Sequence, residues 1–292
     1  MKRLLVLIFI LTMIGSFTMA EEIGLTLGTE VGVREINNIN KSGEGEDIRP
    51  YIMPFISYEK SFFGNALEIY SALNYTFGYT GVPLMDGNSL FPKNQELYFC
   101  IMPTYSLFLG KASALSFILQ HEFAPFLVTP RFEHENNMEC IFMPAIKYGL
   151  SLEHNYFFFM AGVPIIYLHR DKALNTEFGL NLTAGWYSST GLGLELSAFS
   201  TGWFASTIVP SDHFGLNRLE IVLVFEKYPG LYELIAEIPF PYKTSRGFDL
   251  IPKVFFNITE AFQIYGLCRL ERVLADAGEM VISPGVGVKY KF

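Results

Sequence analysis

The chain has 292 residues, a formal net charge of −8 at pH 7, and a composition that is 50% hydrophobic, 17% charged and 16% aromatic. Soluble proteins average about 25% charged residues, so this chain has too few charged groups for an ordinary soluble surface. The aromatic content excludes disorder, and no short period recurs, which excludes collagen-like repeats. After residue 20 the longest uncharged apolar run covers 156–168. That run is too short for a membrane-spanning helix, which needs about 20 apolar residues.

The first twenty residues have the pattern of a secretory signal peptide. Lys2 and Arg3 precede the apolar run 4–14, and the small residues Thr18 and Ala20 form a cleavage site. Cleavage after Ala20 leaves 21–292 as a single expected domain and changes the net charge from −8 to −10. The sequence has no cluster of basic residues that could neutralise phosphates, so we expect no nucleic-acid partner.

The three cysteines, Cys100, Cys140 and Cys268, are odd in number and widely spaced. They form no C-x-x-C pair and have no histidine at metal-ligand spacing. We therefore expect neither a metal site nor any other cofactor, and we interpret the cysteines as small apolar residues on strands.

Side chains alternate between apolar and polar along most of the remaining sequence. In the segment 65–79, Leu67, Ile69, Leu73 and Tyr75 share one parity, and a second clear example covers 175–188. A strand turns successive side chains to opposite faces, so this pattern predicts strands with one apolar and one polar face. Fourteen such segments begin near Glu22, Ile48, Asn65, Gln95, Ala114, Met138, Tyr156, Asn175, Gly191, Leu216, Leu231, Phe248, Phe262 and Val281.

The predicted connections alternate between long and short. Polar stretches such as 34–47 and 80–94 alternate with tight links such as 61–64, and the link 169–174 is of middling length. Bacterial outer-membrane barrels have this asymmetry, whereas a β-sandwich has no reason to sort its loops by parity. The fold class that we predict is an all-β, antiparallel, up-and-down transmembrane β-barrel of about 14 strands. Twelve strands is the alternative, because the segment near 51–56 alternates poorly and the tenth and eleventh segments are short.

The C-terminus carries a further signal. Val288, Tyr290 and the terminal Phe292 share one face of the last predicted strand. This pattern resembles the insertion signal of bacterial outer-membrane β-barrels, and the chain is similar in size to the monomeric fourteen-strand porins. The resemblance implies that periplasmic chaperones and the barrel-insertion machinery are partners, together with outer-membrane lipids. Because the first strand begins almost at Glu21, we expect no N-terminal plug.

The apolar parity should face lipid, with aromatic residues concentrated at the two water boundaries. The belt residues that we predict are Tyr58, Tyr75, Tyr79, Tyr105, Tyr148, Tyr156, Trp186, Phe225, Tyr290 and Phe292.

The polar parity should line the interior, and it is rich in glutamates. An acidic wall favours cations, as rings of carboxylates do in cation-selective pores. We therefore predict a passive channel for small hydrophilic solutes rather than an enzyme. The alternative is a closed interior in which these glutamates pair with basic and tyrosine side chains. The pore-lining residues that we predict are Glu68, Glu96, Glu122, Glu139, Glu177, Glu195, Lys147 and Arg269.

An enzyme and a surface-binding protein are the alternative functions. Outer-membrane lipid hydrolases place a histidine and a serine two residues apart on one strand, but no histidine here is followed two residues later by serine. His121 falls on the apparent lipid face, and 169–171 and 212–213 bring histidine and aspartate together in outer loops. A surface-binding protein would instead use the loops 34–47, 80–94 and 200–215.

Overall fold

The computed structural model describes residues 23–37, 46–62, 65–76, 96–126, 138–170, 173–201, 215–239, 247–274 and 280–292. The predicted signal peptide, 1–20, lies outside these residues. All the regular secondary structure in the described residues is β-strand. The strands are β1 (Ile23–Asn37), β2 (Glu46–Phe62), β3 (Asn65–Thr76), β4 (Glu96–Phe108), β5 (Ser113–Phe126), β6 (Met138–Leu152), β7 (Asn155–Gly162), β8 (Ile165–Arg170), β9 (Ala173–Phe178), β10 (Leu180–Ser188), β11 (Leu192–Thr201), β12 (Gly215–Lys227), β13 (Gly230–Pro239), β14 (Phe248–Asn257), β15 (Phe262–Val273) and β16 (Val281–Lys291).

Two pairs of these strands are halves of one longer strand. On β6, Phe142 pairs with Ile165 of β8 and Ala145 pairs with Gly162 of β7, which is a single unbroken register. The same holds for β9 and β10 against β8 and β7. Pro164 cannot donate a backbone hydrogen bond, which accounts for the interruption at 163–164. Its carbonyl still accepts one from the N–H of Gly179, at 2.9 Å.

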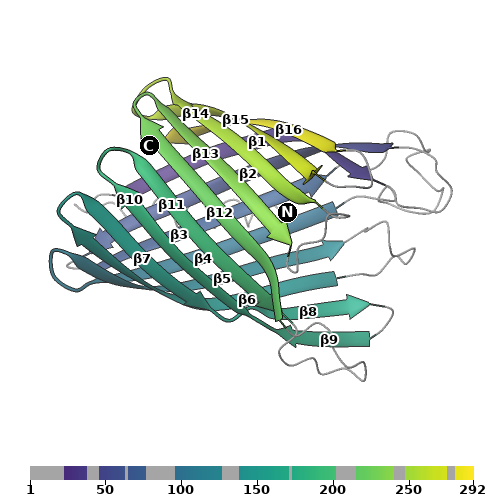
Figure 1. The fold of residues 1–292 in the computed structure, drawn as a ribbon, viewed down its shortest axis with the longest axis horizontal. Helices are drawn as coiled ribbons and strands as arrows, with labels where there is room; N and C mark the ends of the chain where they lie inside the picture. The colour runs from purple at the N-terminus through teal and green to yellow at the C-terminus, as the bar shows by residue number, and fades with distance from the viewer. Residues whose placement is uncertain are drawn as a thin grey trace, which may run out of the picture.

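The resulting fourteen strands form a closed barrel. Each strand pairs antiparallel with its neighbour in sequence, β5 pairs with β6, and β1 closes the ring on β16. Figure 1 shows the strands tilted around the barrel. The prediction of an up-and-down barrel of fourteen strands is confirmed, and the alternative of twelve is wrong, since all fourteen predicted segments form separate strands.

The connections sort to the two ends of the barrel. One end, called the turn end below, carries 63–64, 109–112, 153–154, 189–191, 228–229 and 258–261. At the other end, called the loop end and seen at the right of Figure 1, lie the strand ends that border 38–45, 77–95, 127–137, 171–172, 202–214, 240–247 and 274–280. The link expected over 169–174 is shorter than predicted, because β8 continues to Arg170 and β9 starts at Ala173.

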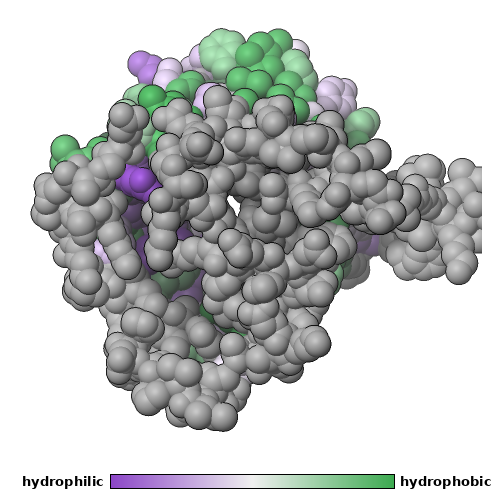
Figure 2. Space-filling model, turned by 90° about the vertical axis from the view of Figure 1, so that its right-hand side faces the viewer, coloured by the Kyte–Doolittle hydropathy of each residue, from purple (hydrophilic) through white to green (hydrophobic). Residues whose placement is uncertain are grey.

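The two faces of the sheet differ as the alternation predicts. On β16, Val281, Ser283, Gly285 and Gly287 are buried on the inside, whereas Ile282 and Val286 are exposed on the outside. In the end-on view of Figure 2, hydrophobic residues gather on the outside of the barrel at the top, and hydrophilic residues are visible toward the middle. The described residues contain no helix that is both long and apolar enough to span a membrane.

Most of the predicted aromatic belt faces outward, with one correction. Tyr105, Tyr148 and Phe225 are among the exposed outer residues. Tyr156 was predicted at the lipid boundary but lies on the inner face, where its ring packs over Gly149 and beside Tyr187. Its parity was misjudged because apolar residues continue on both faces of 156–162. Tyr79 lies outside the described residues.

The seam between the first and last strands is packed from the inside by tyrosines over glycines. The Tyr51 hydroxyl donates to Glu30 Oε1 at 2.8 Å, and the Tyr265 hydroxyl donates to Glu30 Oε2 at 3.1 Å. A Cβ added at Gly287 would overlap the Tyr265 ring. The glycine therefore gives the ring the space from which it reaches Glu30 across the β1–β16 pair.

We predict that Gly287→Ala destabilises the barrel by about 1–3 kcal/mol, because the Cβ displaces the Tyr265 ring. Gly266→Ala is the matched control, since a Cβ at Gly266 meets no atom closer than 4.0 Å. Denaturant-induced unfolding of the two variants in detergent measures the difference. Equal stability of both variants would show that the ring does not depend on Gly287.

Candidate functional site on the inner face of the barrel

The register places every predicted pore-lining position on the inner side of the sheet. The side chains of Glu68, Glu122, Glu195, Lys147 and Arg269 belong to the described part of the structure. Those of Glu96, Glu139 and Glu177 lie outside it, and only their strand positions are known.

These side chains do not form one cluster but have separate local partners. Glu195 accepts a hydrogen bond from the Tyr187 hydroxyl, and Glu122 accepts one from the Gln120 amide. The Lys147 ammonium lies 4.1 Å from the centre of the Phe158 ring. Glu68 is exposed on the inner side of β3. A tyrosine and an amide thus donate hydrogen bonds to two of the predicted carboxylates, and neither donor cancels the negative charge of its partner.

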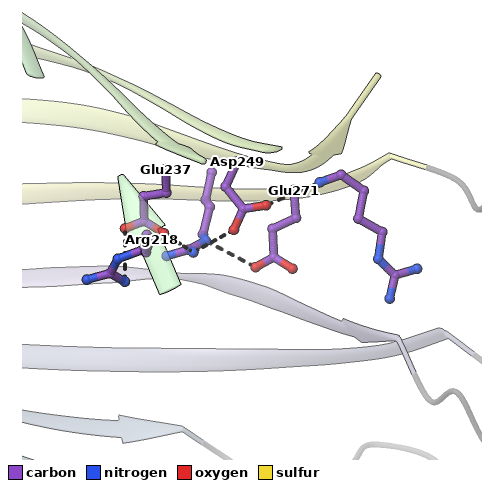
Figure 3. A network of polar contacts seen from close by, with 6 residues as sticks. Arg218, Glu237, Asp249 and Glu271 are labelled. Atoms are coloured by element: carbon purple, nitrogen blue, oxygen red, sulfur yellow. Dashed lines mark hydrogen bonds and ion pairs between the residues drawn. The ribbon is translucent and has the colours of Figure 1, made fainter. Parts of the chain in front are cut away.

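Among the described residues, Arg269 is the centre of the largest network of charges (Figure 3). Its Nη2 donates to Glu237 Oε2 and to Asp249 Oδ2, both at 2.8 Å. Its Nε lies 3.1 Å from Glu271 Oε1. Strands β13, β14 and β15 thus bring one guanidinium and three carboxylates together near the loop end. Arg269 is a predicted pore-lining residue, but the sequence did not indicate that Glu237, Asp249 and Glu271 group around it, because that depends on the register of three strands.

Arg218 adds a second cation at the edge of this network. Its guanidinium stacks 4.3 Å from the centre of the Phe199 ring, and its Nη1 is 4.0 Å from Glu237 Oε1. The contact with Glu237 is long, and 42% of the Arg218 side chain is exposed. Arg218 is therefore held mainly by the aromatic ring and only weakly by the carboxylate.

A polar row crosses the inner face at the level of this network. The cross-strand register puts Thr183 opposite Ser197, Ser197 opposite Glu220, Glu220 opposite Glu237, and Glu237 opposite Asp249. Thr183 and Ser197 hydrogen-bond to each other at 2.9 Å. Glu220 lies in the middle of the row, between the hydroxyl pair and the Arg269 network.

One side-chain step nearer the turn end, the same wall becomes apolar. Val222 lies opposite Ile235, and Ile235 lies opposite Ile251. A further step along, Glu233 and Lys253 form an ion pair of 3.6 Å. Strands β12 to β14 therefore present an apolar row between two charged rows.

The opposite wall mixes apolar and polar residues. Strands seven places apart in a ring of fourteen face each other, so β3–β6 lie across from β12–β15. The middle of the inner face of β3–β6 carries the apolar residues Ala72, Met102, Ile118, Met143 and Ala145 together with the polar residues Glu68, Thr104, Gln120 and Glu122. Among the described residues, the ion network around Arg269 has no counterpart on this wall.

Acidic groups outnumber basic ones among the described inner side chains. The acidic ones are Glu30, Glu59, Glu68, Glu122, Glu195, Glu220, Glu226, Glu233, Glu237, Asp249 and Glu271, and the basic ones are Lys147, Arg218, Lys253, Arg269, Lys289 and Lys291. The inner surface therefore has a net negative charge over the described residues.

The histidine on the lipid face does not form a catalytic pair with serine. His121 lies on the outer side of β5, as the alternation predicts, and its Nε2 is 3.2 Å from Cys140 Sγ. The His169–Asp171 and Asp212–His213 loop positions lie wholly or partly outside the described residues, as do the outer loops considered for surface binding. Among the described residues no group of three metal-ligating side chains occurs.

No family model matches the chain, and no curated protein sequence matches it. Solved structures do resemble it. The toluene transporter TbuX of Ralstonia pickettii has a TM-score of 0.51 at 8% identity, covering 94% of this chain and 90% of that one. The fold is that of an outer-membrane β-barrel. The Pseudomonas putida toluene transporter TodX gives a TM-score of 0.52 at 7% identity, with 94% and 90% covered. A TodX variant described as a monoaromatic hydrocarbon channel gives 0.53 at 7%, with 94% and 91% covered. At these identities the likeness extends to the fold alone.

Within this barrel, a double-mutant cycle tests whether Arg269 and Glu237 act as a unit. Arg269→Gln and Glu237→Gln should each destabilise the barrel, and the double variant should lose about 1 kcal/mol less than the sum. Only a modest coupling is expected because 37% of the Arg269 side chain is exposed. The pair Arg269→Gln with Glu68→Gln, which do not share a partner, should be additive. Additivity of the first pair would contradict the network.

Proposed function

We propose that this protein is an outer-membrane channel that lets small solutes diffuse through the barrel. The observation that carries the proposal is the solvent exposure of charged side chains on the inner wall. The Arg218 side chain is 42% exposed, that of Arg269 37%, and that of Lys253, nearer the turn end, 28%. An interior filled by side chains would bury these groups.

The size of the barrel supports a hydrated interior. Barrels of about eight strands are filled by their side chains, whereas barrels of 16–18 strands leave an aqueous channel. Fourteen strands lie nearer the second case. The likeness to the toluene transporters supports the channel class but not their substrate. A hydrocarbon gains nothing from carboxylates, so the inner wall favours hydrophilic solutes, and its acidic surplus favours cations.

The pure protein in a planar bilayer should conduct in KCl and give a reversal potential that favours K⁺ over Cl⁻. Glu68→Gln combined with Glu195→Gln should lower the K⁺ to Cl⁻ permeability ratio about twofold, because two carboxylates leave the wall. Glu260→Gln is the control, since Glu260 is exposed in the 258–261 turn. A protein without conductance at any voltage would contradict the channel, and cleavage of a lipid or peptide would favour an enzyme instead.

We further propose that the chain is exported by its signal peptide and inserted through its C-terminal strand. The Val288 and Tyr290 side chains are on the outer face, and the Phe292 ring packs edge-on against Tyr290, with ring centres 4.7 Å apart. The Phe292 backbone N–H donates to the Leu25 carbonyl at 2.8 Å. A side-chain substitution at Phe292 therefore leaves this backbone hydrogen bond in place.

Phe292→Ser should reduce the amount of barrel assembled in the outer membrane severalfold but leave refolding in detergent unchanged. The matched control is Phe256→Ser, another exposed outer phenylalanine, on β14. Heat-dependent gel mobility of the folded barrel measures both quantities. Equal assembly of the two variants would mean that Phe292 contributes only as an apolar residue.

A further inference from the structure

We propose that the inner wall binds amphipathic organic cations, with the ammonium group at Glu220 and the apolar part on Val222 and Ile235. The inference deepens the proposed channel function by naming the class of solute. It rests on the proposed function only because a ligand must enter the barrel to reach the site, whose binding groups are on strands β12 and β13.

Glu220 is the inner carboxylate at this level that the ion network leaves without a cation. The Arg269 guanidinium is shared by Glu237, Asp249 and Glu271. Arg218 is the other cation, and it stacks on Phe199 with its nearest ion-pair contact on Glu237. Within the described part of the chain Glu220 makes no hydrogen bond or ion pair, and its neighbour Ser197 is bonded to Thr183. Arg218 and Lys253 act on Glu220 electrostatically, but neither forms an ion pair with it, so its carboxylate oxygens are available to an external cation.

The apolar row adjacent to Glu220 defines the other half of the ligand. Val222 is two residues from Glu220 on the same face of β12, which places the two side chains about 6.6 Å apart along the strand. Ile235 extends the apolar surface onto β13, whereas Ile251 on β14 is buried and Glu195 on β11 lies opposite Val222. An ammonium group joined to a compact apolar body by a short linker matches this spacing.

Other classes of solute match this part of the wall less well. A hydrated inorganic cation would gain nothing from the apolar side chains beside Glu220. A hydrocarbon would displace water from Glu220 without replacing its hydrogen bonds, which costs free energy. An organic anion would be repelled by Glu220 and the carboxylates around Arg269.

The test is isothermal titration of the full barrel in nanodiscs, with empty nanodiscs as the blank. The probe is phenethylammonium, compared with ethylammonium, 2-phenylethanol and 3-phenylpropionate, each of which lacks one recognised feature or reverses the charge. Phenethylammonium should bind at least about tenfold more tightly than each of the three, which corresponds to about 1.4 kcal/mol.

Three variants assign the binding to the proposed groups. Glu220→Gln should weaken phenethylammonium binding about tenfold, because a charge-assisted hydrogen bond is lost. Val222→Thr keeps the side-chain shape and should weaken it severalfold, with ethylammonium unaffected. Glu226→Gln is the control, since Glu226 is an exposed residue of the same strand beside the 228–229 turn and should bind as the wild type does. Heat-dependent gel mobility confirms that each variant is folded.

The outcomes separate this inference from the proposed channel. Absence of phenethylammonium binding, or equal affinity for ethylammonium, overturns the inference even if the barrel conducts K⁺. Unchanged binding by both Glu220→Gln and Val222→Thr also overturns it. Selective binding that both variants weaken supports it, including in a barrel that shows no conductance, and in that case the channel proposal alone fails.

Discussion

The constraint on which the structure depends is that every backbone N–H and C=O within hydrocarbon must be hydrogen-bonded by the protein itself. An open sheet would leave two unpaired edges, and closure removes both. Here closure is made by the pairing of β1 with β16, which continues from Thr26–Lys291 to Gly32–Gly285. The alternation of side chains, the tilt of the strands and the existence of an inner face all follow from that ring.

The seam shows how side chains support the backbone constraint. Glu30 is only 8% exposed, and both of its carboxylate oxygens accept hydrogen bonds from tyrosines that belong to neighbouring strands on either side of the β1–β16 pair. A buried carboxylate is costly unless its oxygens are satisfied, and here two phenol groups satisfy them. The glycines beneath the rings make room for them. The inside of the seam is therefore closed by polar contacts, whereas its outside relies on apolar residues such as Val286.

The inner wall shows how charged side chains can be accommodated inside a barrel. The inner face carries charged side chains, and each one must be paired, held by an aromatic ring or exposed. Arg269, Lys147 and Arg218 illustrate these solutions, with carboxylate partners for the first and aromatic rings for the other two. The apolar row of Val222, Ile235 and Ile251 interrupts the charged rows on the same wall. The inner wall is therefore apolar in some places and charged in others, rather than uniformly polar.

The sequence by itself determined the architecture. The two-residue period, the signal peptide pattern and the alternating connections predicted a fourteen-strand barrel, because a sheet in lipid must separate its faces residue by residue. The parity also placed Glu68, Glu195 and Arg269 on the inner side. Where apolar residues occupy both faces, as around Tyr156, parity carried no information and the prediction failed.

Only the tertiary structure decided which inner residues meet. Arg269 contacts Glu237 and Asp249 because β13, β14 and β15 pair in one particular register. Sliding a strand by two residues keeps each side chain on the same face but changes its partners, so the alternation in the sequence does not determine the register. The position of β3–β6 across from β12–β15 likewise follows from the number of strands in the closed ring. Alternation fixes the face of a side chain, whereas register and closure fix its partners, and those partners determine the chemistry of the inner wall.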